Sequence, residues 1–189
     1  MLSIFDDIFF QSLYRIGFHQ SKLILYMTNK ERIKYFKDRK VIGIDPGKNG
    51  GIAVYSLDKK RLIEVIKMPG TPQELLHYLR LFQFNSVCYL ERVGGLPGMG
   101  GSAMFNFGKQ FGHLEMALIA TKIPTNEVLP QKWQKSLSLG TKGNKSTTEW
   151  KNKLKARAQQ LFPGVGAITL AVSDALLIVK YGIDNEKEK

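Results

Sequence analysis

The feature that most constrains the fold is a series of short apolar runs, separated by turn residues, between residues 41 and 69. The first two are "VIGID" at 41–45 and "GGIAVYSL" at 50–57, which are typical of strands with a Pro-Gly turn between them. A third run, "RLIEVIKMP" at 61–69, follows the polar break "DKK". Together the three runs predict a three-stranded meander.

A helix is predicted after the meander, over residues 71–82. Thr71 suits the N-cap, Pro72 suits the first helical position, and Glu74 stands three residues after the cap, which is the capping-box signature. The next apolar run is "SVCYLE" at 86–91, which predicts a fourth strand. It stops before the glycine-rich stretch "RVGGLPGMGG".

The second half of the chain is predominantly helical in pattern. An apolar stripe with steps of three and four residues consists of Met104, Phe107, Phe111, Leu114 and Leu118. Core packing is the default interpretation of this stripe. The alternative is a dimer interface, because Gly108 and Gly112 would let another backbone approach closely.

Four further segments complete the predicted domain. They are a fifth strand at 126–130, a short helix at 131–137, a basic amphipathic helix within 145–163 and an apolar helix at 170–182. A charged tail at 183–189 follows, and residues 1–40 are interpreted as an N-terminal extension of unknown role. That extension is either a surface amphipathic helix or sequence upstream of a true start at Met27.

Charge and length narrow the function classes. The 189 residues suffice for one domain with a core, and a net charge of +12 favours a polyanionic partner over a merely soluble basic protein.

The single cysteine, Cys88, excludes a disulfide framework or a zinc-cysteine cluster within one chain, and its apolar neighbours predict burial. No apolar segment reaches the roughly 20 residues that cross a bilayer, so we expect no membrane association and a cytoplasmic protein. Asp6 and Asp7 argue against a secretory signal.

Three acidic residues lie in segments that otherwise favour burial. Asp45 ends the first strand, Glu91 ends the fourth, and Asp174 lies on the apolar C-terminal helix. Buried acids need partners, and no basic residue stands at helical spacing from Asp174, where the sequence has Leu170, Ala171, Leu177 and Ile178. A divalent cation, magnesium or manganese, would satisfy all three. The alternatives are a turn-initiating Asp45, an exposed Glu91 and an Asp174 in the first turn of a helix.

Three motifs together resemble those of the RuvC-type Holliday-junction resolvases, particularly their phage-like and organellar relatives. They are "IGIDPGKNGGIA" at 42–53, "YLERVGGLPGMGGSAMFNFG" at 89–108 and "SDALLIVKYG" at 173–182. The resemblance covers about residues 41–182, which would form the nuclease domain. It implies an α/β, ribonuclease-H-like fold, in which a mixed five-stranded sheet is flanked by helices. It also implies a homodimer that cleaves four-way DNA junctions in DNA recombination and repair.

The resemblance assigns catalytic and metal-binding roles to Asp45, Glu91 and Asp174, with Mg2+ as cofactor and Mn2+ as substitute. Two ions roughly 3.5 to 4 Å apart would activate a water and stabilise the leaving 3′ oxygen. Relatives usually carry another acid or histidine three or four residues before the last acid, where this chain has Ala171 and Leu170. Substitutes for that fourth ligand would be Ser173 or Thr169 through water, or Glu115 from another helix.

Five lysines are predicted to contact the DNA backbone. Lys142 and Lys145, in the loop before the basic helix, are assigned to the scissile strand, and the others are Lys48, Lys132 and Lys151. The alternative for the loop is a set of solvated lysines. Such contacts position DNA and make affinity fall with salt.

The glycine-rich loop from 94 to 101 is predicted to meet the junction centre. Phe105 is the preferred wedge between opened bases, with Met99 and Phe107 as alternatives. Three functions therefore stay open: a junction-resolving endonuclease, a catalytically weakened junction-binding protein of the same fold, and an actin-like ATP-dependent phosphotransferase. The last is disfavoured because that fold needs two such domains.

Overall fold

The computed structural model describes residues 28–94, 98, 100–166 and 168–187. The chain divides into two units, Met1–Lys37 and Asp38–Lys189. In the first, helix α3 (Asn29–Lys37) begins after Thr28, whose backbone N–H donates to Glu31 Oε2 at 2.7 Å. Most of the predicted N-terminal extension lies outside the described residues.

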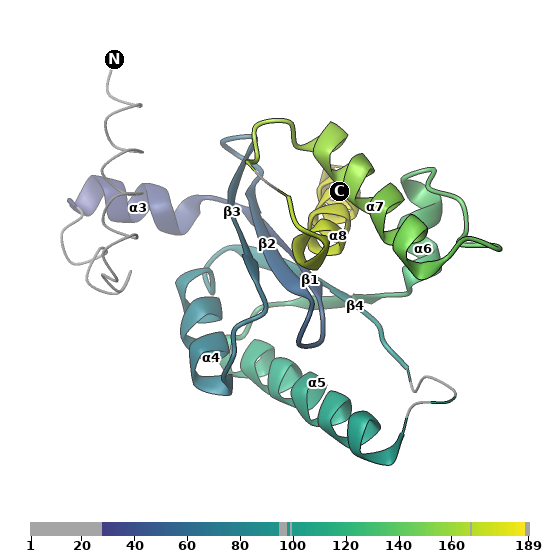
Figure 1. Ribbon diagram of the computed structural model, residues 1–189. Helices are drawn as coiled ribbons and strands as arrows, with labels where there is room; N and C mark the ends of the chain where they lie inside the picture. The colour runs from purple at the N-terminus through teal and green to yellow at the C-terminus, as the bar shows by residue number, and fades with distance from the viewer. Residues whose placement is uncertain (1–27, 95–97, 99, 167, 188–189) are drawn as a thin grey trace. The chain divides into compact units, whose positions relative to one another are not determined.

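The second unit is built on a five-stranded mixed sheet (Figure 1), as predicted. The spatial order is β3-β2-β1-β4-β5, in which β1–β2 and β2–β3 are antiparallel whereas β1–β4 and β4–β5 are parallel. The strands are β1 (Lys40–Asp45), β2 (Gly51–Ser56), β3 (Arg61–Lys67), β4 (Ser86–Glu91) and β5 (Thr125–Val128). The predicted meander is therefore β1 to β3, and β4 returns beside β1.

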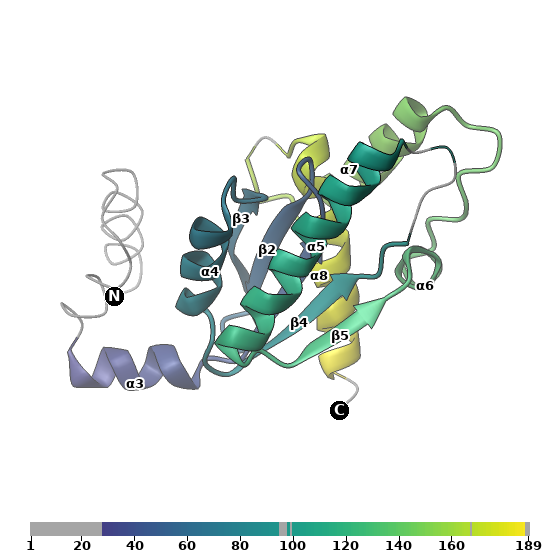
Figure 2. The same cartoon turned by 90° about the horizontal axis from the view of Figure 1, so that it is seen from below.

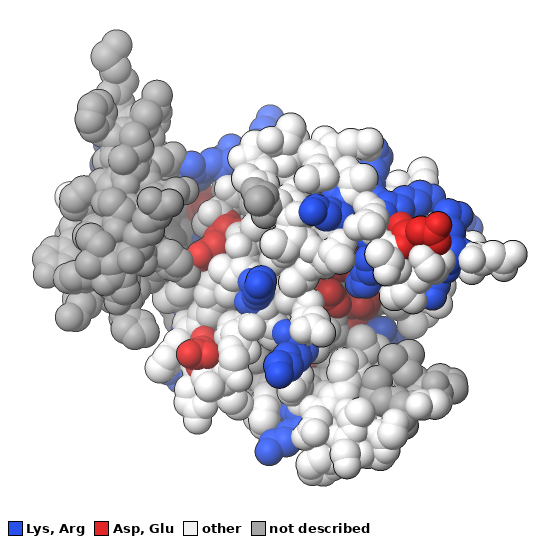
Figure 3. Space-filling model, viewed as in Figure 1, with Lys and Arg blue, Asp and Glu red and all other residues white. Residues whose placement is uncertain are grey.

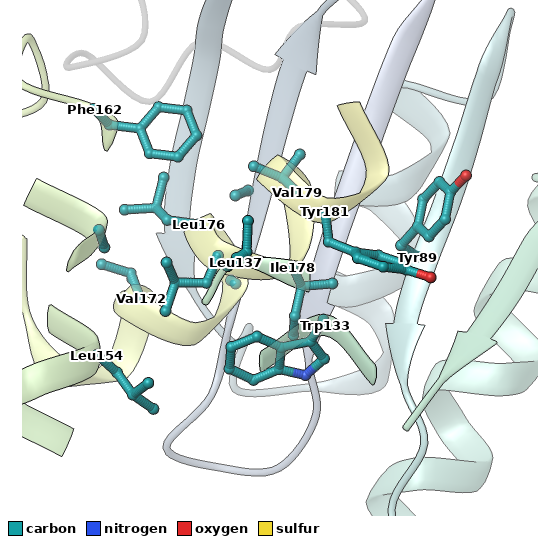
Figure 4. Close-up of a cluster of buried hydrophobic side chains, with 14 of the residues drawn as sticks. Tyr89, Trp133, Leu137, Leu154, Phe162, Val172, Leu176, Ile178, Val179 and Tyr181 are labelled. Atoms are coloured by element: carbon teal, nitrogen blue, oxygen red, sulfur yellow. The ribbon is translucent and has the colours of Figure 1, made fainter. Parts of the chain in front are cut away.

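Helices cover both faces of the sheet (Figures 1 and 2). One layer consists of α4 (Pro72–Leu81) and α5 (Gly101–Thr121), and the other of α6 (Pro130–Ser136), α7 (Thr147–Leu161) and α8 (Leu170–Lys187). Strand alternation divides the core accordingly. Ile42 and Ile44 pack with α4 and α5, whereas Val41 packs with α8. Figure 4 shows this second cluster, where Trp133 of α6 lies among the side chains of α7 and α8.

Helix α8 crosses the sheet at glycines. A Cβ on Gly43 would lie 2.3 Å from the backbone nitrogen of Val179 and 2.6 Å from the carbonyl oxygen of Ala175, so only glycine permits this approach. Gly51, which pairs with Asp45, faces the carbonyl of Ala171 in the same way. Because α8 is enclosed by the sheet, α6 and α7, it is apolar around most of its circumference.

The local predictions for the helices can be compared with the structure. The capping box at Thr71 and Glu74 is present, with Glu74 N–H donating to Thr71 Oγ1 at 3.2 Å. In α5, Leu114 and Leu118 are buried against α4 and the sheet, which confirms the core interpretation for that part of the stripe. Helix α8 continues to Lys187, through most of the predicted charged tail. None of the described helices combines the length and apolarity needed to cross a bilayer.

Candidate active site

Asp45 is the last residue of β1 and stands where the chain turns sharply. Gly47 has φ of +100°, and the N–H of Gly50 donates to the carbonyl of Gly47 at 3.0 Å. A Cβ on Gly50 would lie 2.0 Å from the carbonyl oxygen of Asp45. The turn "PGKNG" therefore depends on its glycines, and it fixes the backbone that carries the Asp45 carboxyl group.

Glu91 ends β4, which lies parallel to β1, so both acids stand at the same edge of the sheet. Alternation places Glu91 on the same face as Tyr89, which packs in the cluster formed with α8. The indole Nε1–H of Trp133, a fully buried residue of α6, donates to Glu91 Oε1 at 3.0 Å. The carboxylate of Glu91 is thereby held toward α6.

Asp174 comes from α8 and lies beside two donors. The Ser173 hydroxyl lies 3.2 Å from Oδ1 and 3.1 Å from the carbonyl oxygen of Leu170, so its one proton is shared between these acceptors, and the ammonium nitrogen of Lys151 lies 2.5 Å from Oδ2. The Asp174 side chain is only 6% exposed, whereas that of Lys151 is 37% exposed. The partner of this buried acid thus comes from another helix, α7. A search for basic residues at helical spacing from Asp174 could not find it.

The pKa values of Asp45 and Glu91 both respond to the charge of Asp174. Burial, with repulsion from Asp174 and Glu91, raises the pKa of Asp45 to about 8, against the opposing effect of Lys151. Burial also raises the pKa of Glu91, although the Trp133 hydrogen bond opposes this. The interaction between the Asp45 and Glu91 side chains further raises the pKa of Asp45 and opposes the rise in the pKa of Glu91.

The same three acids also shift the pKa of Lys151, which carries the opposite charge. Its burial alone would lower the pKa of its ammonium group, but attraction to Asp174, Asp45 and Glu91 outweighs this, and the pKa is raised. The ammonium group therefore acts as the cation of the acidic cluster.

The acidic cluster has the chemistry, but not the ready arrangement, of a metal site. Its all-oxygen donors and mutual repulsion suit a hard divalent cation. Within the described part of the chain, however, no three His, Cys, Asp or Glu side chains are grouped so that they could hold a metal as they stand. The Asp174 carboxylate is paired with Lys151.

Of the candidates for a fourth ligand, only Ser173 lies beside one of the three acids. Leu170 and Ala171 are apolar, and Thr169 is exposed just before α8. Glu115 is exposed on α5, a helix of the layer on the other face of the sheet. The Ser173 hydroxyl is within hydrogen-bond distance of Asp174.

The predicted DNA-contacting lysines lie at the surface. Lys48, Lys132, Lys142 and Lys145 are exposed, and Lys142 donates to the Thr147 hydroxyl at 2.9 Å. In Figure 3 basic side chains gather on the part of this face where Figure 1 shows α6 and α7. Lys151 differs from the other four, because it points into the acidic cluster.

The wedge candidates have separate environments. Phe105 is 71% exposed near the start of α5. Phe107 is half-buried, and its ring lies beside Gly47 of the turn after Asp45. Met99 lies outside the described residues.

Sequence reasoning did not find Trp133, although it is the direct partner of Glu91. The helix that carries it was predicted, yet nothing in the local pattern distinguishes this tryptophan from a core residue. The useful signal is that a fully buried indole needs an acceptor for its N–H.

Comparison with known proteins supports the fold. The sequence matches no protein-family model and no curated protein. The structure is similar to that of Thermus thermophilus RuvC in complex with a Holliday junction substrate, with a TM-score of 0.56 and 18% identity over 79% of this chain and 96% of that one. A second Thermus thermophilus RuvC structure matches with a TM-score of 0.52 and 17% identity over the same shares. The chain therefore has the ribonuclease-H-like fold of RuvC, while the phage-like or organellar branch stays a prediction.

Proposed function

We propose that this protein is a structure-selective DNA endonuclease that resolves four-way junctions by metal-dependent phosphodiester hydrolysis. The observation that carries the proposal is the repulsion between Asp174 of α8 and the acids Asp45 and Glu91, which end two neighbouring strands. Charge crowding of this kind is costly without a function. Its occurrence in a fold shared with a junction-bound RuvC supports a nuclease.

The three carboxylates would hold Mg2+, with Mn2+ as a substitute. When bound, the cation supplies a nucleophilic water at neutral pH and stabilises charge on the phosphate. The chain supplies the placement of the acids: the glycine turn fixes Asp45, the Trp133 indole orients Glu91, and the close packing of α8 on Gly43 fixes the backbone that carries Asp174. Asp45 also has to lose its proton, and a cation beside it favours that loss.

The exposed lysines would bind the DNA backbone beside this site. Lys142 and Lys145 lie in the loop that leads into α7. The same helix carries Lys151, so this loop is close in sequence to a residue of the acidic cluster. Lys48 belongs to the turn after Asp45, and Lys132 stands next to Trp133 in α6. Phe105 is the proposed wedge at the junction centre.

The proposed partner is a second copy of this chain. A four-way junction is cut at two symmetry-related strands, so two active sites are required. The outward face of α5 offers a surface for this contact, with exposed Met116 and Ile119 close to Gly108 and Gly112 on the helix. A Cβ on either glycine would meet nothing within 4 Å, so a second helix has room to approach closely.

The decisive test is cleavage of a labelled four-way junction in Mg2+ by wild type and Asp45→Asn. We expect paired nicks from the wild type, their loss in Asp45→Asn, and no cleavage of a linear duplex of the same sequence. Glu115→Gln is the matched control, because Glu115 is an exposed acid on α5. Cleavage that survives in Asp45→Asn would move the active site elsewhere.

A catalytically weakened junction-binding protein is the second candidate. Two observations favour it: Ala171 and Leu170 replace the usual fourth ligand, and Lys151 already neutralises Asp174. Such a protein would bind the junction with the same salt dependence but leave it uncut, even in Mn2+. Gel-shift and cleavage assays on one preparation distinguish the two.

A further inference from the structure

A lysine of α7 is paired with one acid of the proposed metal-binding cluster. Lys151 Nζ lies 2.5 Å from Asp174 Oδ2, and its charge also acts on Asp45 and Glu91. Lys151 therefore contacts one carboxylate directly and the other two feel its charge. This is more than a DNA-contacting lysine requires, since Lys142 and Lys145 are exposed and turned to other partners or solvent.

The backbone beneath Lys151 is held firmly. Helix α7 begins with a capping box, in which Ser146 N–H donates to Glu149 Oε2 at 2.8 Å and Glu149 N–H donates to Ser146 Oγ at 3.2 Å. The next residue, Trp150, is buried in the core, as is Leu154 one turn on. Any rearrangement at this position is therefore confined to the lysine side chain.

The two members of the ion pair differ in freedom. Asp174 is nearly fully buried, and its Oδ1 lies within hydrogen-bond distance of the Ser173 hydroxyl. The Lys151 side chain is partly exposed and long, so it can rotate toward solvent. When the pair separates, the lysine is the partner that moves, and the carboxylate stays available to another cation.

We propose that Lys151 is an exchangeable internal counter-ion, which pairs with Asp174 until a divalent cation displaces it and frees its ammonium group for a DNA phosphate. This inference rests on the proposed metal-binding role of the three acids. Without metal, the lysine stabilises a crowd of negative charge that would otherwise oppose folding. With metal, the displaced ammonium lies beside the site, where the scissile strand is to be bound. Metal affinity is reduced by the fraction of molecules in which the pair is closed.

The test measures metal binding without DNA. Lys151→Gln removes the counter-ion, Lys151→Arg retains its charge, and Lys155→Gln is a matched control one turn further along α7. Calorimetric titration with Mg2+ is expected to show roughly tenfold tighter binding to Lys151→Gln than to wild type, as for loss of a competing pair worth about 1.4 kcal/mol. Lys151→Arg and Lys155→Gln are expected to match wild type.

Thermal unfolding provides a second readout. In chelator, Lys151→Gln is expected to melt roughly 3 to 10 °C below wild type, because an acid is left without its partner, and Mg2+ is expected to restore most of the difference. Mg2+ affinity equal to or weaker than that of wild type, or an unchanged melting temperature in chelator, would overturn the exchange. If Lys151→Gln binds Mg2+ more tightly but the wild type cuts no junction, the exchange is supported and the proposed nuclease activity is rejected. If the wild type cuts junctions but Lys151→Gln has unchanged Mg2+ affinity, the nuclease activity is supported and the exchange is rejected.

Discussion

The indole Nε1–H of Trp133 donates a 3.0 Å hydrogen bond to Oε1 of Glu91, which joins α6 to the end of β4. Trp133 has no solvent exposure, so its N–H has no access to water in place of this acceptor. The bond holds Glu91 in one orientation and opposes the rise in its pKa that burial causes. A core residue therefore also orients a proposed metal ligand.

Trp133→Phe is expected to lose stability and cleavage together. Phenylalanine fills most of the same volume but cannot donate to Glu91, and a hydrogen bond to a charged group contributes about 1.5 to 3 kcal/mol. We expect a lower free energy of unfolding in urea by about that amount, and a 10- to 100-fold drop in junction cleavage, as for partners of metal ligands. Trp150→Phe is the control, since Trp150 is buried against other core residues of α7 and α8. Equal loss of cleavage in both variants would contradict an orienting role for Trp133.

Asp45→Asn is expected to stabilise the protein at alkaline pH while abolishing cleavage. The folded-state pKa of Asp45 is raised to about 8, above the value of about 3.9 of an unfolded chain. A carboxyl group with a raised pKa contributes stability that is complete below pH 4 and is lost as the pH rises to 8. Asparagine keeps the neutral form, so at pH 8 in chelator the variant is expected to be more stable by about 1 to 3 kcal/mol.

The measurement for Asp45 is the difference between the two pH profiles of unfolding free energy, because groups outside the acidic cluster titrate equally in both proteins. That difference is expected to grow from pH 4 to pH 8. A constant difference over this range would mean that Asp45 is already ionised at pH 4. Cleavage assays in Mg2+ on the same preparations separate the gain in stability from the loss of function.

Gly43→Ala tests the contact between β1 and α8. The added Cβ would meet backbone atoms of Val179 and Ala175, which can yield only if the helix moves. We expect a loss of roughly 3 kcal/mol or more in a urea titration, and a loss of cleavage because α8 carries Asp174. Gly101→Ala, at the first residue of α5 with nothing within 4 Å of the new Cβ, is expected to change stability by less than about 0.5 kcal/mol. Equal stability of the two variants would place α8 farther from β1.

Local chemistry explains why much of the fold was predictable. Strand alternation places Ile42 and Ile44 on one face of the sheet and Val41 on the other, and the capping box at Thr71 marks the start of α4. Both effects act within a few residues. The positions of Asp45 and Glu91 follow, because parallel strands end at the same edge of a sheet. The helical continuation of α8 to Lys187 was missed, since its last turns look like a charged tail. In the structure, Ile183 is buried and Tyr89 donates to Glu186 Oε1 at 2.7 Å.

The partners of the acids were not predictable for a different reason. Trp133 stands 42 residues from Glu91, and Lys151 stands 23 residues from Asp174. Each pairing depends on how a helix is rotated about its axis once it packs on the sheet, and that rotation is set by the whole core. The sequence pattern predicted a basic amphipathic helix here, and that pattern is equally consistent with a Lys151 that contacts DNA.

Ile119→Glu tests the outward face of α5 as the contact between two copies of the chain. Ile119 is 66% exposed in the single chain, so a charge there costs little in stability but is costly inside an apolar interface. We expect the wild type to sediment as a dimer and Ile119→Glu as a monomer that still binds Mg2+ but cuts only one strand of a junction. Phe84→Glu, at another exposed apolar position before β4, is the matched control and is expected to stay dimeric. A dimeric Ile119→Glu would show that the interface lies on another surface. A monomeric wild type that makes paired nicks would show that junction cleavage does not require a dimer.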